Sequence, residues 1–185
     1  MTARPQDPTT DRPAAPHSGA QGRQPGAASD RAPSAVPGLL LGLGLGGFID
    51  GIVLHQILQW HHMLSGTNDN PMTTLAGLEA NTLADGIFHT ATWILVAAGT
   101  LGMLRSWQQQ RRAPSGGFHL GLLLLGWGAF NITEGVINHI ILGVHHVRDD
   151  LGGPASWDIA FLISGVALCA AGWAIHTKAA AAAHR

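Results

Sequence analysis

Carboxylate and imidazole side chains recur at two places in this sequence with the same spacing. Each copy consists of an acid, a histidine five residues later and a histidine pair that begins six residues after that. The members are Asp50, His55, His61 and His62 in the first copy and Glu134, His139, His145 and His146 in the second. Both copies lie in apolar surroundings, where polar groups are costly to bury. Imidazole and carboxylate groups bind transition metals and carry protons, so these residues are the candidate functional site.

The similarity between the two copies extends beyond the acid and the histidines. Aligning the chain with itself at an offset of 84 residues gives 11 identities in the 24 positions from Leu39 to His62. The matched residues include Gly42 with Gly126 and Gly44 with Gly128. The sequence therefore predicts an internal duplication, in which two copies of a helical hairpin face each other.

A third acid and histidine, Asp85 and His89, lie between the two copies. Residues four apart share one face of a helix, so these two can act together. Asp50 and His55 are five apart, or about 140° around a regular helix, and binding one ion together would require a π-bulge or other partners. One predicted metal site therefore combines Asp85 and His89 with His55 and His139. Alternatively, His55 and His139 are the two axial ligands of a haem.

The remaining groups are expected to support this site. Asp50 and Glu134 would orient the ligands or accept protons, and the histidine pairs 61–62 and 145–146 would capture ions at its mouth. Imidazole with carboxylate suits copper, iron or zinc and does not suit calcium or magnesium. Whether the chain is an enzyme is left open, because an oxygen-reactive iron site would use the same ligands.

Two other functions fit the same residues. In the first, the intramembrane acids and histidines form a proton or ion conduit. In the second, they form a buried polar network that only fixes how the helices pair. A charged carboxylate facing lipid at mid-membrane costs about 2.5 to 3.5 kcal/mol, so in every case the acids must face inward.

Composition indicates a membrane protein. The chain is 46% hydrophobic and only 11% charged, against about 25% charged in an ordinary soluble domain. Its 10 basic and 11 acidic residues are nearly balanced, which argues against a nucleic-acid-binding surface. The single cysteine, Cys169, excludes an intrachain disulfide and thiolate metal motifs.

Hydrophobic segments of the length needed to cross a bilayer predict an all-α, four-helix, up-down-up-down bundle. The expected spans are residues 38–62, 76–104, 118–144 and 156–177. We expect residues 1–36 to form a disordered tail, residues 37–178 to form the bundle and residues 179–185 to form a C-terminal tail. Nine of the ten basic residues lie in the tails or the middle connection, which predicts a multi-pass cell-membrane protein with both termini cytoplasmic.

The glycines of the first span spell a nucleotide-binding fingerprint, Gly42-x-Gly44-x-x-Gly47. That fingerprint requires a preceding strand, whereas these glycines lie within an apolar helix. We therefore expect no nucleotide. Small residues let neighbouring helices approach closely in lipid, and close packing is the predicted role.

The run from Gly42 to Met63, the Asp85-Gly86-x-x-His89 motif and the Glu134-Gly135-x-x-x-His139 motif resemble a family of bacterial predicted membrane proteins, domain of unknown function 2243. The resemblance covers about residues 38–177. It implies a multi-pass bacterial membrane protein and no particular reaction. It also implies a link to respiratory oxidase assembly components, which fits the handling of copper or haem at the outer face.

Overall fold

The computed structural model describes residues 34–111 and 115–182, and all of their long elements are helices. Two helices continue directly into π-helical segments at their C-terminal ends. The elements are α1 (Val36–Ile49) with η1 (Asp50–Ile57), α2 (Leu75–Gln108), α3 (Gly116–Glu134) with η2 (Gly135–Leu142), the short η3 (Asp149–Leu151) and α4 (Ala155–Ala182). The described ranges contain no β-strand, and the all-α fold class is confirmed.

Four helical units are long and apolar enough to cross a membrane: 36–57, 75–108, 116–142 and 155–182. Each overlaps one of the expected spans. The fourth continues to Ala182, through residues where a C-terminal tail is expected from the sequence. Most of the expected N-terminal tail, residues 1–33, lies outside the described residues.

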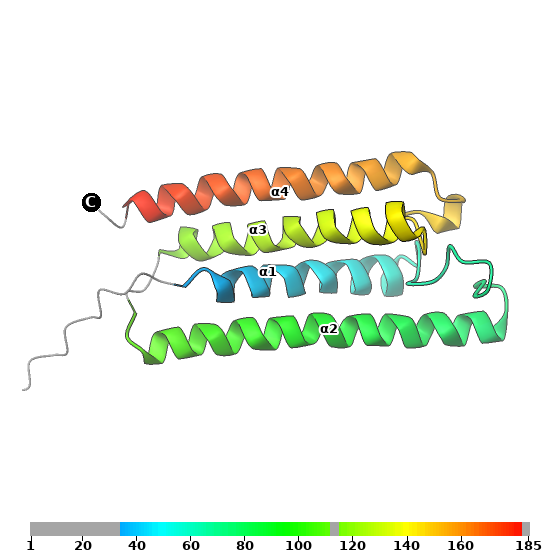
Figure 1. Cartoon of the computed structure of the whole chain (residues 1–185), viewed down its shortest axis with the longest axis horizontal. Coiled ribbons are helices and arrows are strands. Elements are labelled where there is room, and N and C mark those ends of the chain that lie inside the picture. The colour runs from blue at the N-terminus through cyan, green and yellow to red at the C-terminus, as the bar shows by residue number, and fades with distance from the viewer. Residues whose placement is uncertain (1–33, 112–114, 183–185) are drawn as a thin grey trace, which may run out of the picture.

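The four helices lie side by side in a single layer, in the order α2, α1, α3, α4 (Figure 1). The chain runs one way along α1 and α3 and returns along α2 and α4. Within the described residues, the backbone of each outer helix lies next to only one of the central pair. The outer helices leave large apolar side chains such as Trp93 and Trp173 exposed, as lipid-facing surfaces require.

Glycine allows the central helices α1 and α3 to meet closely. A Cβ atom on Gly42 would lie 2.8 Å from the Cα atom of Gly126, and a Cβ on Gly126 would lie 2.8 Å from the Cα of Gly42. Real Cβ atoms do not approach other atoms so closely, so a side chain at either position would force the helices apart. The prediction that these glycines serve close packing is confirmed at this crossing.

Close approach at a glycine also joins each central helix to its outer neighbour. A Cβ on Gly44 would lie 2.8 Å from the carbonyl oxygen of Thr92 in α2, and a Cβ on Gly128 would lie 2.5 Å from that of Gly165 in α4. Both glycines belong to the repeated pattern read from the sequence. The two hairpins, α1–α2 and α3–α4, therefore pack through equivalent positions.

The first and third helices end earlier than the sequence suggests. The first ends at Ile57 and the third at Leu142, although the expected spans reach residues 62 and 144. Gln59 (φ 55°) and Gly143 (φ 57°) adopt left-handed conformations that turn the chain away from the helix axis. The histidine pairs therefore lie on two return segments, residues 58–66 and 143–150, which fold over the ends of the central helices.

Candidate metal centre

The π-helical segments bring each acid next to the histidine five residues later. A π-helix closes its hydrogen bonds between residues five apart, so such residues lie nearly one above the other. Asp50 Oδ2 lies 3.2 Å from His55 Nε2, and Glu134 Oε2 lies 3.1 Å from His139 Nε2. The regular-helix separation of about 140° therefore does not apply at these two positions.

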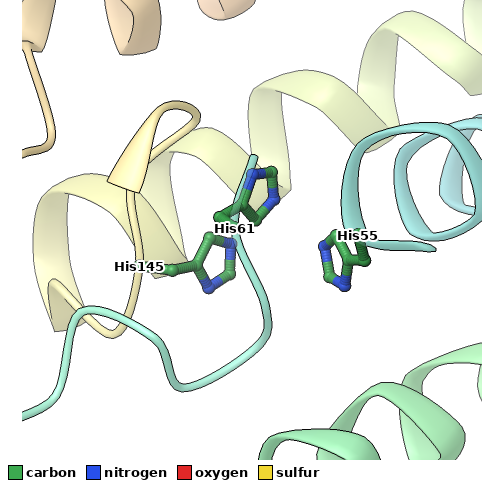
Figure 2. Close-up of side chains that lie close together, drawn as sticks. All are labelled: His55, His61 and His145. Carbon is green, nitrogen blue, oxygen red and sulfur yellow. The ribbon is translucent and has the colours of Figure 1, made fainter. Parts of the chain in front are cut away.

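The return segments place two further imidazoles between the helix ends. The rings of His61 and His145 stack with centroids 4.7 Å apart and an interplanar angle of 8°. Figure 2 shows these two rings beside each other, with His55 facing them from the end of its helix. His61 also lies 4.5 Å from His55, and His145 lies 4.9 Å from His139, measured between ring centroids. All four rings are buried.

Each stacked histidine donates a hydrogen bond to the opposite return segment. His61 Nδ1 lies 3.0 Å from the carbonyl oxygen of Val147, and His145 Nδ1 lies 3.2 Å from that of Met63. A carbonyl oxygen can only accept, so Nδ1 carries the proton in both rings. In the neutral imidazole, Nε2 then carries no proton and offers a lone pair. In both residues this atom faces the centre of the cluster.

Backbone hydrogen bonds join the same two segments. The amide of Gly66 donates to the carbonyl of Val144 at 2.9 Å, and the amide of Asp150 donates to the carbonyl of Trp60 at 3.1 Å. Gly66 and Asp150, like Trp60 and Val144, occupy positions 84 residues apart. The two return segments are therefore joined by hydrogen bonds at equivalent positions of the repeat.

Two further carboxylates, Asp85 and Asp158, lie beside the Nδ1 atoms of the histidines on the central helices, His55 and His139. Asp85 Oδ1 accepts from His55 Nδ1 at 3.0 Å and from the Met63 amide at 3.0 Å. Asp158 repeats this arrangement from α4. Its Oδ1 lies 3.2 Å from His139 Nδ1, without the alignment of a hydrogen bond.

Asp158 Oδ1 also accepts from the Val147 amide at 3.0 Å. Asp158 in the second half is therefore the counterpart of Asp85 in the first: each carboxylate faces a histidine Nδ1 and accepts a hydrogen bond from a return-segment amide. Its sequence neighbours differ from those of Asp85, and it lies 73 positions further along rather than 84. The repeat alone would not have identified it.

Several buried atoms at the centre of this cluster have no hydrogen-bond partner. They are both carboxylate oxygens of Asp50, Oε2 of Glu134, and Nε2 of His55, His61 and His139. Buried polar atoms in proteins are nearly always paired, so a group of six such atoms requires an explanation.

The converging atoms are close enough to share a metal ion. The ligand atoms of His55, His61 and His145 lie within 4.8 Å of one another, as do those of Glu134, His139 and His145. Both sets are fully buried. Together with Asp50, which lies beside His55 and His61, these sets bring together six of the predicted site residues.

Three other predicted site residues lie around this centre. Asp85 binds the Nδ1 side of His55 and lies behind it. His62 and His146 take the remaining oxygens of the outer carboxylates: Nδ1 of His62 lies 2.6 Å from Asp85 Oδ2, and Nδ1 of His146 lies 2.7 Å from Asp158 Oδ2.

His89 is not part of the converging group. Its Nδ1 donates to the carbonyl of Asp85 one turn earlier, at 2.7 Å, and its ring packs near Phe48 and Phe88. The four-residue set of Asp85, His89, His55 and His139 is therefore not the set that the structure assembles. The sequence interpretation assigned His61 and His145 to the mouth of the site and so did not include them in this set.

A cavity of about 440 Å³ reaches the cluster from the side of the return segments. Its lining includes His61 and His62 together with Asp149 and Asp150. Burial, reinforced by the nearby His145 and His55, lowers the pKa of His61 to about 2. His61 is therefore neutral at pH 7 and can offer a lone pair.

Arg148 lies on the second return segment, two residues after His146. It forms a salt bridge with Asp150 at 2.7 Å, which lowers the pKa of that carboxyl. Its guanidinium lies 4.4 Å from the ring centre of Trp60 and 5.2 Å from that of Trp157. These cation–π contacts connect the first return segment with the start of α4.

Comparisons with known proteins place the chain in a family. No curated protein and no solved structure matches it. The sequence model of a family described as "Predicted membrane protein (DUF2243)" matches residues 37–179, which include all four helices up to the last turn of α4. The chain belongs to this family of predicted membrane proteins.

Proposed function

We propose that this membrane protein binds a transition metal at the buried centre described above. The ligands are four imidazoles and two carboxylates: His55, His61, His139, His145, Asp50 and Glu134. One observation carries the proposal. All four rings direct Nδ1 toward a backbone or carboxylate oxygen, which leaves Nε2 to face the centre.

That orientation is typical of metal-binding histidines. A histidine ligand usually donates its second ring N–H to a carboxylate or a backbone carbonyl, which fixes the tautomer and the direction of the lone pair. Here Asp85 and Asp158 serve the helix-borne rings, and the carbonyls of Val147 and Met63 serve the other two. The lone pairs and carboxylates would repel one another without a cation between them.

The roles of the acids differ from those expected from sequence. Asp50 and Glu134 lie on the Nε2 side and would bind the metal directly, whereas Asp85 lies on the Nδ1 side and would orient His55. His62 and His146 would steady the outer carboxylates. The donor set contains nitrogen and oxygen only, which suits zinc, iron or copper(II).

A haem between His55 and His139 is poorly supported. The ring of His61 lies 4.5 Å from that of His55 and 6.1 Å from that of His139. The ring of His145 lies 6.0 Å and 4.9 Å from the same two rings. Two imidazoles thus fill the space that a porphyrin would need.

The location of the centre suits metal capture from outside the cell. If both termini are cytoplasmic, as the distribution of basic residues predicts, the return segments face outward. The cavity beside His61 would then admit ions from that side. The family resemblance adds the proposal that the bound metal serves respiratory oxidase assembly.

A proton pathway is the second candidate, because Asp50 and His55 at 3.2 Å could share a proton instead of a metal. A path across the membrane would also need groups in the inner half of the central helices. Residues 36–49 and 120–133 contain no ionisable side chain. Metal binding is therefore the better-supported function.

Elemental analysis of purified protein tests the proposal. We expect bound transition metal in the wild type and its loss in the double variant His61→Ala/His145→Ala. His89→Leu is the matched control, because it removes a membrane histidine outside the centre. Wild-type protein that stays free of metal after incubation with zinc, iron and copper salts would overturn the proposal, as would equal loss in the control.

A further inference from the structure

We infer that the centre holds two metal ions, one in each half of the molecule, and that two histidines and one carboxylate bind each ion. This inference rests on the proposed metal-binding function. The first ion would be bound by Asp50, His55 and His61. The second would be bound by Glu134, His139 and His145.

The second half contains a complete ligand set. Glu134 Oε2 lies 3.1 Å from His139 Nε2, and Glu134 Oε1 lies 2.8 Å from His145 Nε2. The ligand atoms of these three residues all lie within 4.8 Å of one another. All three come from η2, the turn before it and the return segment that follows.

The first half repeats this set at equivalent positions. Asp50 Oδ2 lies 3.2 Å from His55 Nε2, and Asp50 Oδ1 lies 3.9 Å from His61 Nε2. In each half, therefore, the two oxygens of one carboxylate face two different imidazoles. That pattern indicates one binding position per half rather than a single central one.

A single four-coordinate ion would not use all of the available donors. Such an ion can bind four of the six side chains and would leave two of them without a metal. Charge leads to the same conclusion. Four carboxylates are buried in and behind the centre: Asp50, Asp85, Glu134 and Asp158. With neutral histidines, two divalent ions balance these four charges, whereas one ion leaves two of them uncompensated.

The two ions would lie close together. His55, His61 and His145 form a set that crosses between the halves, with ligand atoms within 4.8 Å of one another. The parallel rings of His61 and His145 lie 4.7 Å apart at this boundary. Three protein ligands per ion also leave coordination positions open for water or another small ligand.

Copper(II) titration of metal-free, full-length protein in detergent tests the inference. We expect two copper ions per chain, with an electron paramagnetic resonance spectrum broadened or reduced by interaction between the two spins. Asp50→Asn and Glu134→Gln should each bind one copper ion and give the spectrum of an isolated ion. His89→Leu should keep both ions and the spin interaction.

The outcomes separate the two claims. One copper per chain in the wild type, with an isolated-ion spectrum, overturns the two-ion inference and leaves the proposed function standing. No copper in the wild type overturns both. Two copper ions without spin interaction also contradict the inference. If the variants fail to fold, stoichiometry and spin interaction in the wild type alone decide the question.

Discussion

His61 and His145 stack face to face, with their ring centroids 4.7 Å apart, although they lie in opposite halves of the chain. Each donates its Nδ1 proton to a carbonyl on the other return segment. Each ring is thus positioned by the half to which it does not belong. The centre exists only when both halves are folded together.

The carboxylates behind the helix-borne histidines should tune metal affinity. Asp85→Asn and Asp158→Asn each weaken the acceptor facing a histidine Nδ1. Loss of such a partner typically lowers metal affinity by about 10- to 100-fold. We expect weaker binding at unchanged stoichiometry, measured by competition with a chelator. An unchanged affinity in both variants would contradict the orienting role.

The glycine crossing should be essential for assembly. Gly42→Val places a branched side chain against Gly126, which should separate α1 from α3 and lower the melting temperature or the yield of folded protein. Overpacking of this kind costs at least about 1 to 3 kcal/mol. Gly86→Val is the matched control, since a Cβ there meets nothing within 4 Å. Equal behaviour of the two variants would contradict the packing account.

The sequence predicted the helices well because hydrophobic length and turn residues alone determine where a chain can cross a membrane. It predicted the acids and histidines because a repeated polar pattern in an apolar helix is conspicuous. It did not predict that His61 and His145 enter the core. That placement depends on Gln59 and Gly143 adopting left-handed conformations, which ends each helix early.

The roles of the individual acids could not be predicted from the sequence either. Asp50 and His55 converge because the helix becomes π-helical between them, and the residue types at these positions do not specify that change. Asp158 was not among the predicted site residues, because it lies outside the 84-residue repeat. Its role follows from the packing of α4 against α3, which brings it to His139.

Acidification should destabilise the metal-free protein. The pKa of His61 in the folded protein, about 2, lies below its unfolded value of 6.5. Below pH 6.5 the unfolded chain takes up a proton that folded His61 does not, so stability falls by up to about 1.4 kcal/mol per pH unit from this group. Thermal unfolding in detergent between pH 7.5 and pH 5 measures the slope. His61→Gln keeps a donor for Val147 and should reduce the slope; an unchanged slope would contradict burial of a neutral His61.

The orientation in the membrane can be tested with cysteine labelling. Cys169→Ser removes the only cysteine, and single cysteines can then be placed at the exposed positions Asn68 and Gln109, at opposite ends of α2. We expect Asn68→Cys in intact cells to react with a membrane-impermeant maleimide. Gln109→Cys should react only after permeabilisation. The reverse pattern would place the centre on the cytoplasmic side.

X-ray absorption spectroscopy of the metal-loaded protein tests the ligand set most directly. We predict nitrogen and oxygen scatterers at about 2.0 to 2.2 Å, outer-shell scattering from several imidazole rings and no sulfur. Replacing His61 and His145 with alanine should reduce the imidazole scattering, and His89→Leu should leave it unchanged. A spectrum with sulfur at about 2.3 Å, or one without imidazole, would contradict the assignment of the metal to this centre.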